Sequence, residues 1–301
     1  MEIKTYLNDQ RLVIERALEQ YMLTAEVEHG TFAAHIEAMR YSLFAGGKRV
    51  RPILCLAAGQ AIGARPDSDA DLLPIACALE CIHTYSLIHD DLPAMDDDDL
   101  RRGKPTNHIL HGEAGAILAG DGLLTWAFDL LSNSNQSMLP PEKRLAIIHL
   151  IARAAGSLGM VGGQALDIAN ENKEFPFETL RAIHRSKTGA LITASILAGA
   201  IAAGADQTQQ EALTRYGEQV GLAFQIVDDL LNVTATTEQL GKAAGSDAGK
   251  GKATYPAFFG NDTTRKMAGI AVEEAESALA LFDEKADPLR AIAQYILTRS
   301  H

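Results

Sequence analysis

The stretch His89-Asp90-Asp91-Leu92-Pro93-Ala94-Met95-Asp96-Asp97-Asp98-Asp99 organises this chain, because it places a row of carboxylates directly after an apolar segment, 82–88. Such carboxylates would repel one another unless a cation lay among them. Hard divalent cations that prefer oxygen ligands are suited to this place. The stretch therefore predicts a magnesium site. The alternative is a solvated charge run at the end of a helix, an equally good explanation for residues 97–99 alone.

A second aspartate pair, Asp228-Asp229, ends another apolar run, 220–227. Two such pairs, each emerging from a buried helix, could face each other across one cavity and hold several metal ions between them. In the first cluster, Asp96 can share a metal with Asp90 only if Pro93 unwinds the end of the helix. In the second, Asp228 and Asn232 are four residues apart and share one helix face.

Composition narrows the class of protein. The chain has 301 residues and a net charge of -12, which argues against a nucleic-acid partner. Cys55, Cys77 and Cys81 fall in apolar segments without metal-ligand spacing, which indicates buried thiols in a reducing compartment. The N-terminus lacks the apolar core of a signal peptide, and no apolar run reaches membrane-spanning length without polar interruption. We expect a cytoplasmic protein with no membrane span.

Helical periodicity covers most of the chain, and no segment is typical of a strand. We predict an all-α protein forming a single domain over residues 1–301. The expected helices span 2–28, 32–44 (capped by Thr31), a segment begun by Pro52 and running to 62, 69–91, 113–131, 141–170, 178–203 (interrupted near 187–189), 208–233, and two or three more from Tyr255. Residues 92–112 are expected to be irregular.

Positively charged side chains form a second cluster in the sequence. Lys48, Arg49 and Arg51 follow the Gly46-Gly47 turn and can make a cradle for a phosphate or diphosphate. The alternative is a basic cap on the preceding helix. The segment 234–253, which contains Lys242, Lys250 and Lys252, looks like a lid over an anion, or else a plain surface loop.

Taken in order, these motifs resemble those of the trans-isoprenyl diphosphate synthases, closest to the bacterial farnesyl diphosphate synthase type. The resemblance runs from about residue 30 to the C-terminus and rests on segments 46–52, 90–96, 101–103, 163–167, 187–189 and 224–229. It implies a helical bundle of the isoprenoid synthase type around a deep central cavity, and a homodimer. It also implies Mg²⁺, isopentenyl diphosphate, and an allylic diphosphate, either dimethylallyl or geranyl.

The resemblance also assigns roles to residues. It implies metal binding by Asp90, Asp91, Asp96, Asp228 and Asp229. It implies binding of isopentenyl diphosphate by Lys48, Arg51, His83 and Arg102, with Gly47 also among the substrate-binding residues. Stabilisation of the leaving diphosphate is implied for Arg101, Lys187, Lys242 and Lys252, and stabilisation of the allylic cation for Thr188 and Gln225. The main catalytic group comprises Asp90, Asp96, Lys187, Thr188 and Gln225. The departed diphosphate is the expected proton acceptor.

Two features bear on how this chain differs within the family. Asn232 stands where the family's second motif usually ends in aspartate, which predicts slightly weaker metal binding and retained activity. Ile82, Tyr85 and Ser86 would form the floor that stops the growing prenyl chain. Tyr85, with two extra residues in the first motif, resembles farnesyl synthases.

Other functions remain open at this point. Geranylgeranyl diphosphate synthesis is the nearest alternative, because the floor positions differ little between the two. A metal-dependent phosphohydrolase of the His-Asp class could use His89-Asp90. An inactive paralogue that serves as a dimer partner could account for Asn232.

Overall fold

The computed structural model describes residues 2–22, 30–64, 69–135, 137–234 and 253–299. The elements are α1 (Ile3–Tyr21), the 3₁₀ turn η1 (Gly30–Phe32), α2 (Ala33–Leu43), α3 (Val50–Ile62), α4 (Asp69–Asp90), β1 (Leu100–Arg101), β2 (Lys104–Pro105), α5 (Asn107–Ser132), α6 (Pro141–Ala155), α7 (Met160–Asn170), α8 (Phe177–His184), the π-helical turn η3 (Arg185–Gly189), α9 (Ala190–Ala203), α10 (Gln207–Thr234), α13 (Tyr255–Ala278), the 3₁₀ turn η4 (Glu284–Ala286) and α14 (Asp287–Thr298). The all-α prediction is confirmed.

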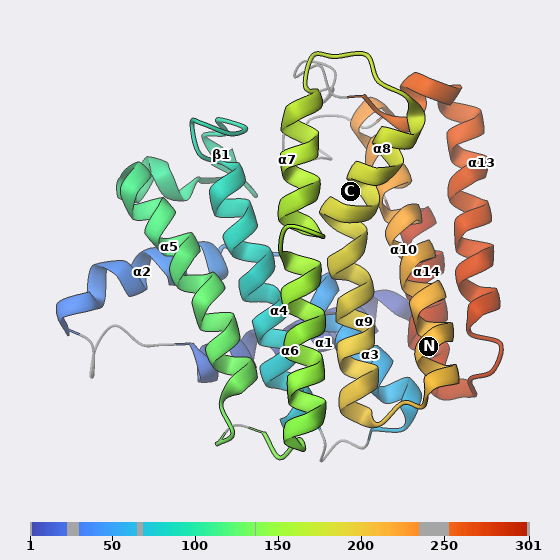
Figure 1. Ribbon diagram of the computed structural model, residues 1–301, viewed down its shortest axis with the longest axis horizontal. Helices are drawn as coiled ribbons and strands as arrows, with labels where there is room; N and C mark the ends of the chain where they lie inside the picture. Colours follow the sequence, from blue (N-terminus) through green and yellow to red (C-terminus); the bar gives the residue numbers. More distant parts are fainter. Residues whose placement is uncertain (1, 23–29, 65–68, 136, 235–252, 300–301) are drawn as a thin grey trace.

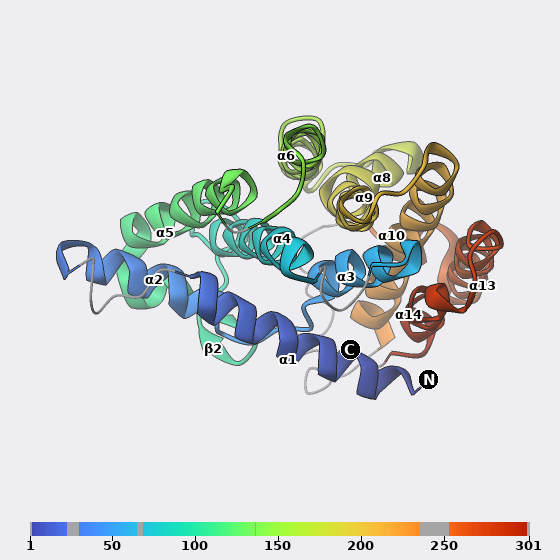
Figure 2. The ribbon, with the colours of Figure 1, turned by 90° about the horizontal axis from the view of Figure 1, so that it is seen from below.

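Most of the long helices run side by side along one direction (Figure 1). Seen along that direction, α3 and α4 lie inside the bundle, with α1, α5, α9, α10 and α14 around them (Figure 2). Helices that are apolar all round belong in such interior places. One cluster of buried apolar side chains runs from Ile14 to Ile296. It is consistent with a single domain, which stays a prediction.

The central helices approach one another closely where small residues face each other. A Cβ atom added to Gly199 of α9 would lie 2.0 Å from the carbonyl oxygen of Cys55 in α3. Glycine is therefore required for this backbone contact, since any side chain would push the two helices apart.

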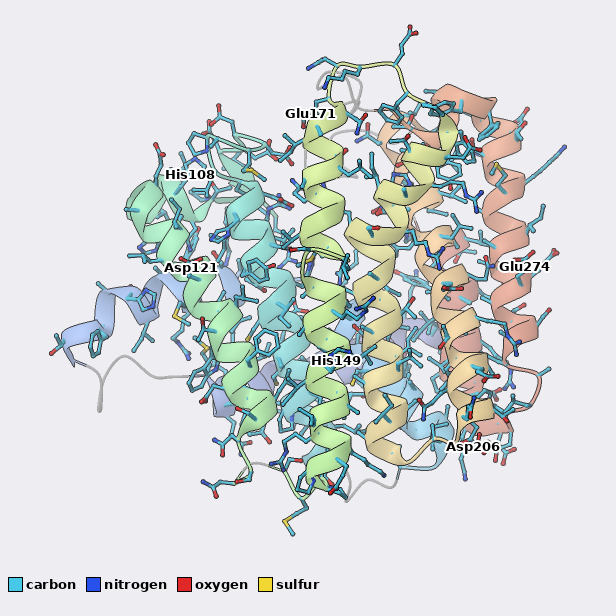
Figure 3. The ribbon with its side chains drawn as sticks, in the orientation of Figure 1. His108, Asp121, His149, Glu171, Asp206 and Glu274 are labelled. Atoms are coloured by element: carbon cyan, nitrogen blue, oxygen red, sulfur yellow. The ribbon has the colours of Figure 1, made fainter. Side chains whose placement is uncertain are left out.

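The ends of α4 and α10 lie at the same end of the bundle. Asp206, directly before α10, and Glu171, directly after α7, are at opposite ends (Figure 3). Helix α10 runs from the Asp206 end towards the Glu171 end, where the hairpin that follows α4 also lies (Figure 1). The fold thus brings both aspartate clusters to one end, as two facing metal-binding motifs require.

A short hairpin corrects the prediction that the chain contains no strand. β1 and β2 form a two-stranded antiparallel sheet, with Leu100 opposite Pro105 and Arg101 opposite Lys104. The turn residues Arg102 and Gly103 have φ of 53° and 74°. Positive φ at both positions is typical of the two-residue turn whose twist suits a hairpin, and an Arg-Gly pair is a weak signal for it.

Several predicted helix limits are also wrong. Helix α2 is not capped by Thr31, since its N-cap is Phe32; α3 begins at Val50, before Pro52; and α5 begins at Asn107, with a kink at Gly112 where φ is 73°. The predicted helix 141–170 is two helices, α6 and α7, separated at 156–159. The predicted interruption near 187–189 is confirmed as the π-helical turn η3.

By length and apolar composition alone, 4 described helical segments could cross a membrane: Asp71–Asp90, Asn107–Ser132, Pro141–Asn170 and Phe177–Ala203. The prediction that no segment reaches spanning length is therefore wrong by this criterion. The most apolar window of the first segment is 72% buried inside the protein, against 28% for the third. The first is thus covered mainly by other helices, whereas α6 and α7 lie at the outside of the bundle.

Candidate active site

The first aspartate cluster follows the end of α4. The helix ends at Asp90, and the chain then turns so that the backbone N–H of Asp96 donates to the carbonyl of Asp90 at 2.8 Å. This bond closes a ring of backbone and places Asp96 beside Asp90. The predicted unwinding after α4 is confirmed, and it brings the backbone of Asp96 to that of Asp90, two residues that a straight helix would place on different faces.

Asp91 lies in a different environment from Asp90. Its side chain is 4% exposed and receives three hydrogen bonds from Arg101, two from Nε at 2.8 and 2.9 Å and one from Nη2 at 2.6 Å. A fork-like pair of this kind fixes both side chains. Asp91 therefore anchors Arg101, and its predicted role as a metal ligand stays a prediction that must compete with this ion pair.

The Gly46-Gly47 turn and the hairpin turn meet. Arg102 Nη1 donates to the carbonyl of Gly46, and a Cβ atom added to Gly47, where φ is 143°, would lie 2.7 Å from that same Nη1. Glycine at position 47 is thus needed both for its backbone conformation and for the close approach of Arg102. The predicted substrate-binding residues Gly47 and Arg102 are brought together by this contact.

Arg49, predicted as a third cation of the cradle, is instead 2% exposed and pairs with Glu80. Lys48 and Arg51 remain, and nearby charges act on both. Burial lowers the pKa of Lys48, with further lowering by the nearby charges of Arg299 and Arg102. Burial also lowers the pKa of Arg51 to about 10, and Arg102 adds to that effect. Clustered cations that destabilise one another's charge are stabilised when an anion binds among them. The cluster therefore suits a diphosphate.

His83 faces the same cations from α4. Burial, followed by the charges of Arg51, Arg102 and Arg101, lowers its pKa well below the ordinary value. The imidazole is consequently neutral at pH 7, and it can contact an anionic substrate by hydrogen bonding rather than by charge. His83 thus lies near Arg51 and Arg102, two cations with which it was predicted to bind isopentenyl diphosphate.

The two aspartates of the second pair lie in different environments. Asp228 has a side chain that is 43% exposed and pairs with Arg299, whose guanidinium also donates to the carbonyl of Phe224 at 3.0 Å. Asp229 is buried, and its Oδ2 accepts from the backbone N–H of Tyr255 at 2.8 Å, at the start of α13. Asp228 is therefore the carboxylate presented outward, whereas Asp229 joins α10 to α13.

Asn232 lies on α10 with Asp228, as predicted, but it is only 3% exposed. A buried amide in this place is less accessible to a metal ion than Asp228, one turn earlier. The prediction that Asn232 permits activity is untested by these contacts.

The π-helical turn η3 positions Lys187 and Thr188. Lys187 Nζ contacts Asp167 Oδ2 of α7 at 2.8 Å. A Cβ atom added to Gly163, also on α7, would lie 2.3 Å from the backbone nitrogen of Lys187, so the two segments touch at a glycine. π-turns inside helices often occur at functional sites. Thr188 and the α10 residue Gln225 are both partly buried.

Tyr85, Ser86 and Ile82 lie on the inner part of α4. Tyr85 is 5% exposed and Ile82 is fully buried, while Ser86 Oγ donates to the carbonyl of His83 at 2.8 Å. Tyr85 packs edge-on against His89, with ring centroids 5.7 Å apart. Tyr85 is thus a bulky, buried ring on α4, and both its role as a floor and the central cavity above it stay predictions.

His89 disfavours the phosphohydrolase alternative. Its Nε2 lies 3.0 Å from the carbonyl of Ile117, and the ring is so close to Gly120 that an added Cβ would lie 2.2 Å from Nε2. The imidazole is thus packed against α5.

Sequence reasoning missed Arg299 and Glu80. Arg299 belongs to no motif and lies next to the end of the chain, so its contact with Asp228 depends on how α14 packs. Glu80 stands alone among apolar residues of α4, so no sequence pattern indicated a functional role for it. Lys242 and Lys252, predicted to contact the diphosphate, lie outside the described residues.

A family model described as polyprenyl synthetase matches residues 33–280. A geranylgeranyl diphosphate synthase of Cyanophora paradoxa is 46% identical over 99% of this chain and 96% of its own. A farnesyl diphosphate synthase of Geobacillus stearothermophilus is 46% identical over 100% of this chain and 99% of its own.

Solved structures agree with these relatives. The apo structure of an FPP/GFPP synthase from Zymomonas mobilis superposes with a TM-score of 0.85 at 38% identity, covering 98% of each chain. A geranyltransferase from Legionella pneumophila gives a TM-score of 0.84 at 35% identity, covering 99% of this chain and 96% of its own.

Proposed function

The chain belongs to the polyprenyl synthetase family, and from that premise we propose that it condenses isopentenyl diphosphate with dimethylallyl or geranyl diphosphate to give farnesyl diphosphate. It is a prenyltransferase, a short-chain trans-prenyl synthase. The observation that supports the detailed proposal is the 2.8 Å backbone hydrogen bond between Asp96 and Asp90, at the end of the bundle towards which α10 runs.

Magnesium is the metal on which this family generally depends. Within the described residues, no three His, Cys, Asp or Glu side chains are grouped as a metal site. Magnesium does not require such a cage, because it usually binds one or two carboxylates together with substrate phosphates. Asp90, Asp96 and Asp228 fit this pattern, since each offers only oxygen. The bound ion would supply positive charge that stabilises the leaving diphosphate.

The side chains of the protein would divide the remaining work. Lys187 and Arg101, each held by a carboxylate, would donate hydrogen bonds to the departing diphosphate. Thr188 and Gln225 would present oxygen atoms to the allylic cation. The double bond of isopentenyl diphosphate, held by the cradle at Lys48, then attacks that cation, and the departed diphosphate accepts the proton that is lost.

Tyr85 supports farnesyl diphosphate as the product. Measured along α4, it lies about 7 Å below Asp90, at 1.5 Å per residue. A buried aromatic ring at that depth would stop a growing chain after few isoprene units. A twenty-carbon product is the second candidate, and it is favoured by the equal 46% identity to a geranylgeranyl diphosphate synthase.

A homodimer belongs to the same proposal. Helix α5 carries exposed apolar side chains, namely Ile109, Leu110, Ile117 and Leu118, between 43% and 57% exposed. A second copy of the chain could cover this surface. Cytoplasmic location and the absence of a nucleic-acid partner are proposed with it, the latter from the net charge of -12.

The experiment that tests the proposal combines the purified protein with Mg²⁺, labelled isopentenyl diphosphate and each allylic diphosphate in turn. Products are dephosphorylated and separated by chain length. A fifteen-carbon product supports the proposal. A twenty-carbon product would show that the product is geranylgeranyl diphosphate instead. Release of phosphate without condensation would overturn it.

A further inference from the structure

The interior of α4 contains a carboxylate that the reaction does not use. Glu80 is 1% exposed and is surrounded along its helix by apolar residues, including Cys77 and Cys81. A buried charge is strongly unfavourable unless it is paired. The pairing group is Arg49, whose Nη1 lies 2.7 Å from Glu80 Oε1, and both side chains are at most 2% exposed.

Arg49 joins four segments at this point, since its Nε also lies 3.9 Å from Glu15 Oε1 of α1. It is the N-cap residue of α3, its Nη2 donates to the carbonyl of Leu43 at the end of α2 at 2.8 Å, and its ion pair reaches α4. Its φ of 52° lies in the left-handed region. That conformation costs a non-glycine residue about 1 kcal/mol, so the surrounding contacts must hold it in place.

The Arg49–Glu80 pair is also adjacent in sequence to the cations of the cradle. Lys48 directly precedes it and Arg51 follows two residues later. The direction in which those two side chains leave the backbone depends on the conformation at position 49. A disturbance of the Arg49–Glu80 pair would therefore move both cations.

Glu80 also acts on the cradle through its charge. Its carboxylate favours the charged forms of Arg51 and Arg102, opposing the lowering of pKa that burial imposes on each. Within the described part of the chain, Glu80 Oε2 and Arg51 Nε are both buried and have no hydrogen-bond partner. Glu80 is thus a buried carboxylate that interacts with three cations, Arg49, Arg51 and Arg102.

We propose that Glu80 is a positioning residue for isopentenyl diphosphate, which it serves through Arg49 by fixing Lys48 and Arg51 in the orientation that receives the diphosphate. The inference rests on the proposed function. It assigns no contact between Glu80 and the substrate. The allylic diphosphate, held by the aspartate clusters, Arg101 and Lys187, should depend much less on this pair.

The test uses two variants and one control. Glu80→Gln keeps the shape of the side chain and removes its charge. The double variant Arg49→Met with Glu80→Leu replaces the pair by apolar groups, which buried ion pairs often tolerate without loss of stability. Glu19→Gln breaks the exposed Arg40–Glu19 pair, whose oxygen and nitrogen are 2.6 Å apart, and serves as the matched control.

For each variant we would measure KM for isopentenyl diphosphate and for geranyl diphosphate, kcat, the melting temperature, and calorimetric binding of inorganic diphosphate. We expect Glu80→Gln to raise KM for isopentenyl diphosphate, and to weaken diphosphate binding, by about tenfold or more. KM for geranyl diphosphate should stay within about twofold of the wild-type value. The double variant should melt near the wild-type temperature yet keep the raised KM, and the control should match the wild type.

Two results would overturn the inference: a double variant with the wild-type KM for isopentenyl diphosphate, or equal changes in KM for both substrates in Glu80→Gln. Absence of condensation by the wild-type protein would instead reject the proposed function, and diphosphate binding would still report on Glu80.

Discussion

The guanidinium group of Arg299 is ion-paired with the carboxylate of Asp228. The same group lies 4.0 Å from the centroid of the Phe224 ring, so it stacks on one side chain of α10 while it contacts another. The segment that follows the last helix is thereby held against the second aspartate pair. The fold connects the end of α14 directly to the candidate active site.

Replacement of Arg299 by Gln should lower the free energy of unfolding by about 1–2 kcal/mol, since it removes a cation–π contact and an ion pair that water partly screens. Urea denaturation would measure the change. The exposed Arg265, replaced in the same way, is the control and should shift the midpoint little. Equal stability of the Arg299 variant and the wild type would show that the pair contributes nothing.

Replacement of Asp90 by Ala, or of Asp96 by Asn, should reduce kcat by about 10³-fold while leaving the fold intact, because both residues would stabilise charge on the leaving group. Circular dichroism and product assays would separate the two effects. Asp99→Asn, at an exposed neighbour, should keep normal activity. Near-normal turnover of the Asp90 variant, or its unfolding, would count against the metal assignment.

His83 should remain neutral in the folded protein as the pH is lowered through about 6.5, the ordinary value for histidine. The unfolded chain takes up that proton first, so stability should fall as the pH drops below this value. NMR of the labelled imidazole would follow the titration, and His83→Gln should show a weaker pH dependence of unfolding. A ring that titrates near its ordinary value would contradict the prediction.

Replacement of Tyr85 by Ala should lengthen the product, because it removes the buried ring that would block the chain. Tyr85→Phe keeps the ring and should leave the product unchanged. Chromatography of dephosphorylated products from both variants would compare them. The same product length in the Ala variant would place the floor at another residue.

Cys55, Cys77 and Cys81 should not react with a thiol reagent in the folded protein. All three are free and buried, and burial raises their pKa values, that of Cys55 to about 12. Thiolate is the reactive form, and it is scarce under these conditions. A colorimetric assay should detect the three thiols only after unfolding, and fast labelling of the native protein would disprove the burial.

The main helices could be predicted because the sequence patterns that indicate them lie within each helix or directly beside it. Apolar periodicity marked the helices, Pro93 marked the unwinding after α4, and Lys187-Thr188-Gly189 marked the interruption before α9. The hairpin at 100–105 was missed, since Arg102 is an unusual residue for a turn that needs positive φ. The division of 141–170 was missed because its apolar pattern continues across the break.

Within the site, residue types were predictable but partners were not. The sequence placed Asp90 and Asp91 in one motif, and it could not show which of the two carboxylates is bound to Arg101. The pairs Arg49–Glu80 and Asp228–Arg299 each join residues distant in the chain. Contacts of that kind follow from the packing of whole helices, which a single sequence does not specify.

The bond between the Asp96 amide and the Asp90 carbonyl also bears on how this chain can change over evolutionary time. Exposed loops usually accept inserted or deleted residues with little penalty. The segment 91–95 should not accept them within its present turn, because one residue more or fewer would open the ring closed by this bond. A change in the length of this loop should therefore be inherited together with a new turn conformation, whereas its exposed residues can change one at a time.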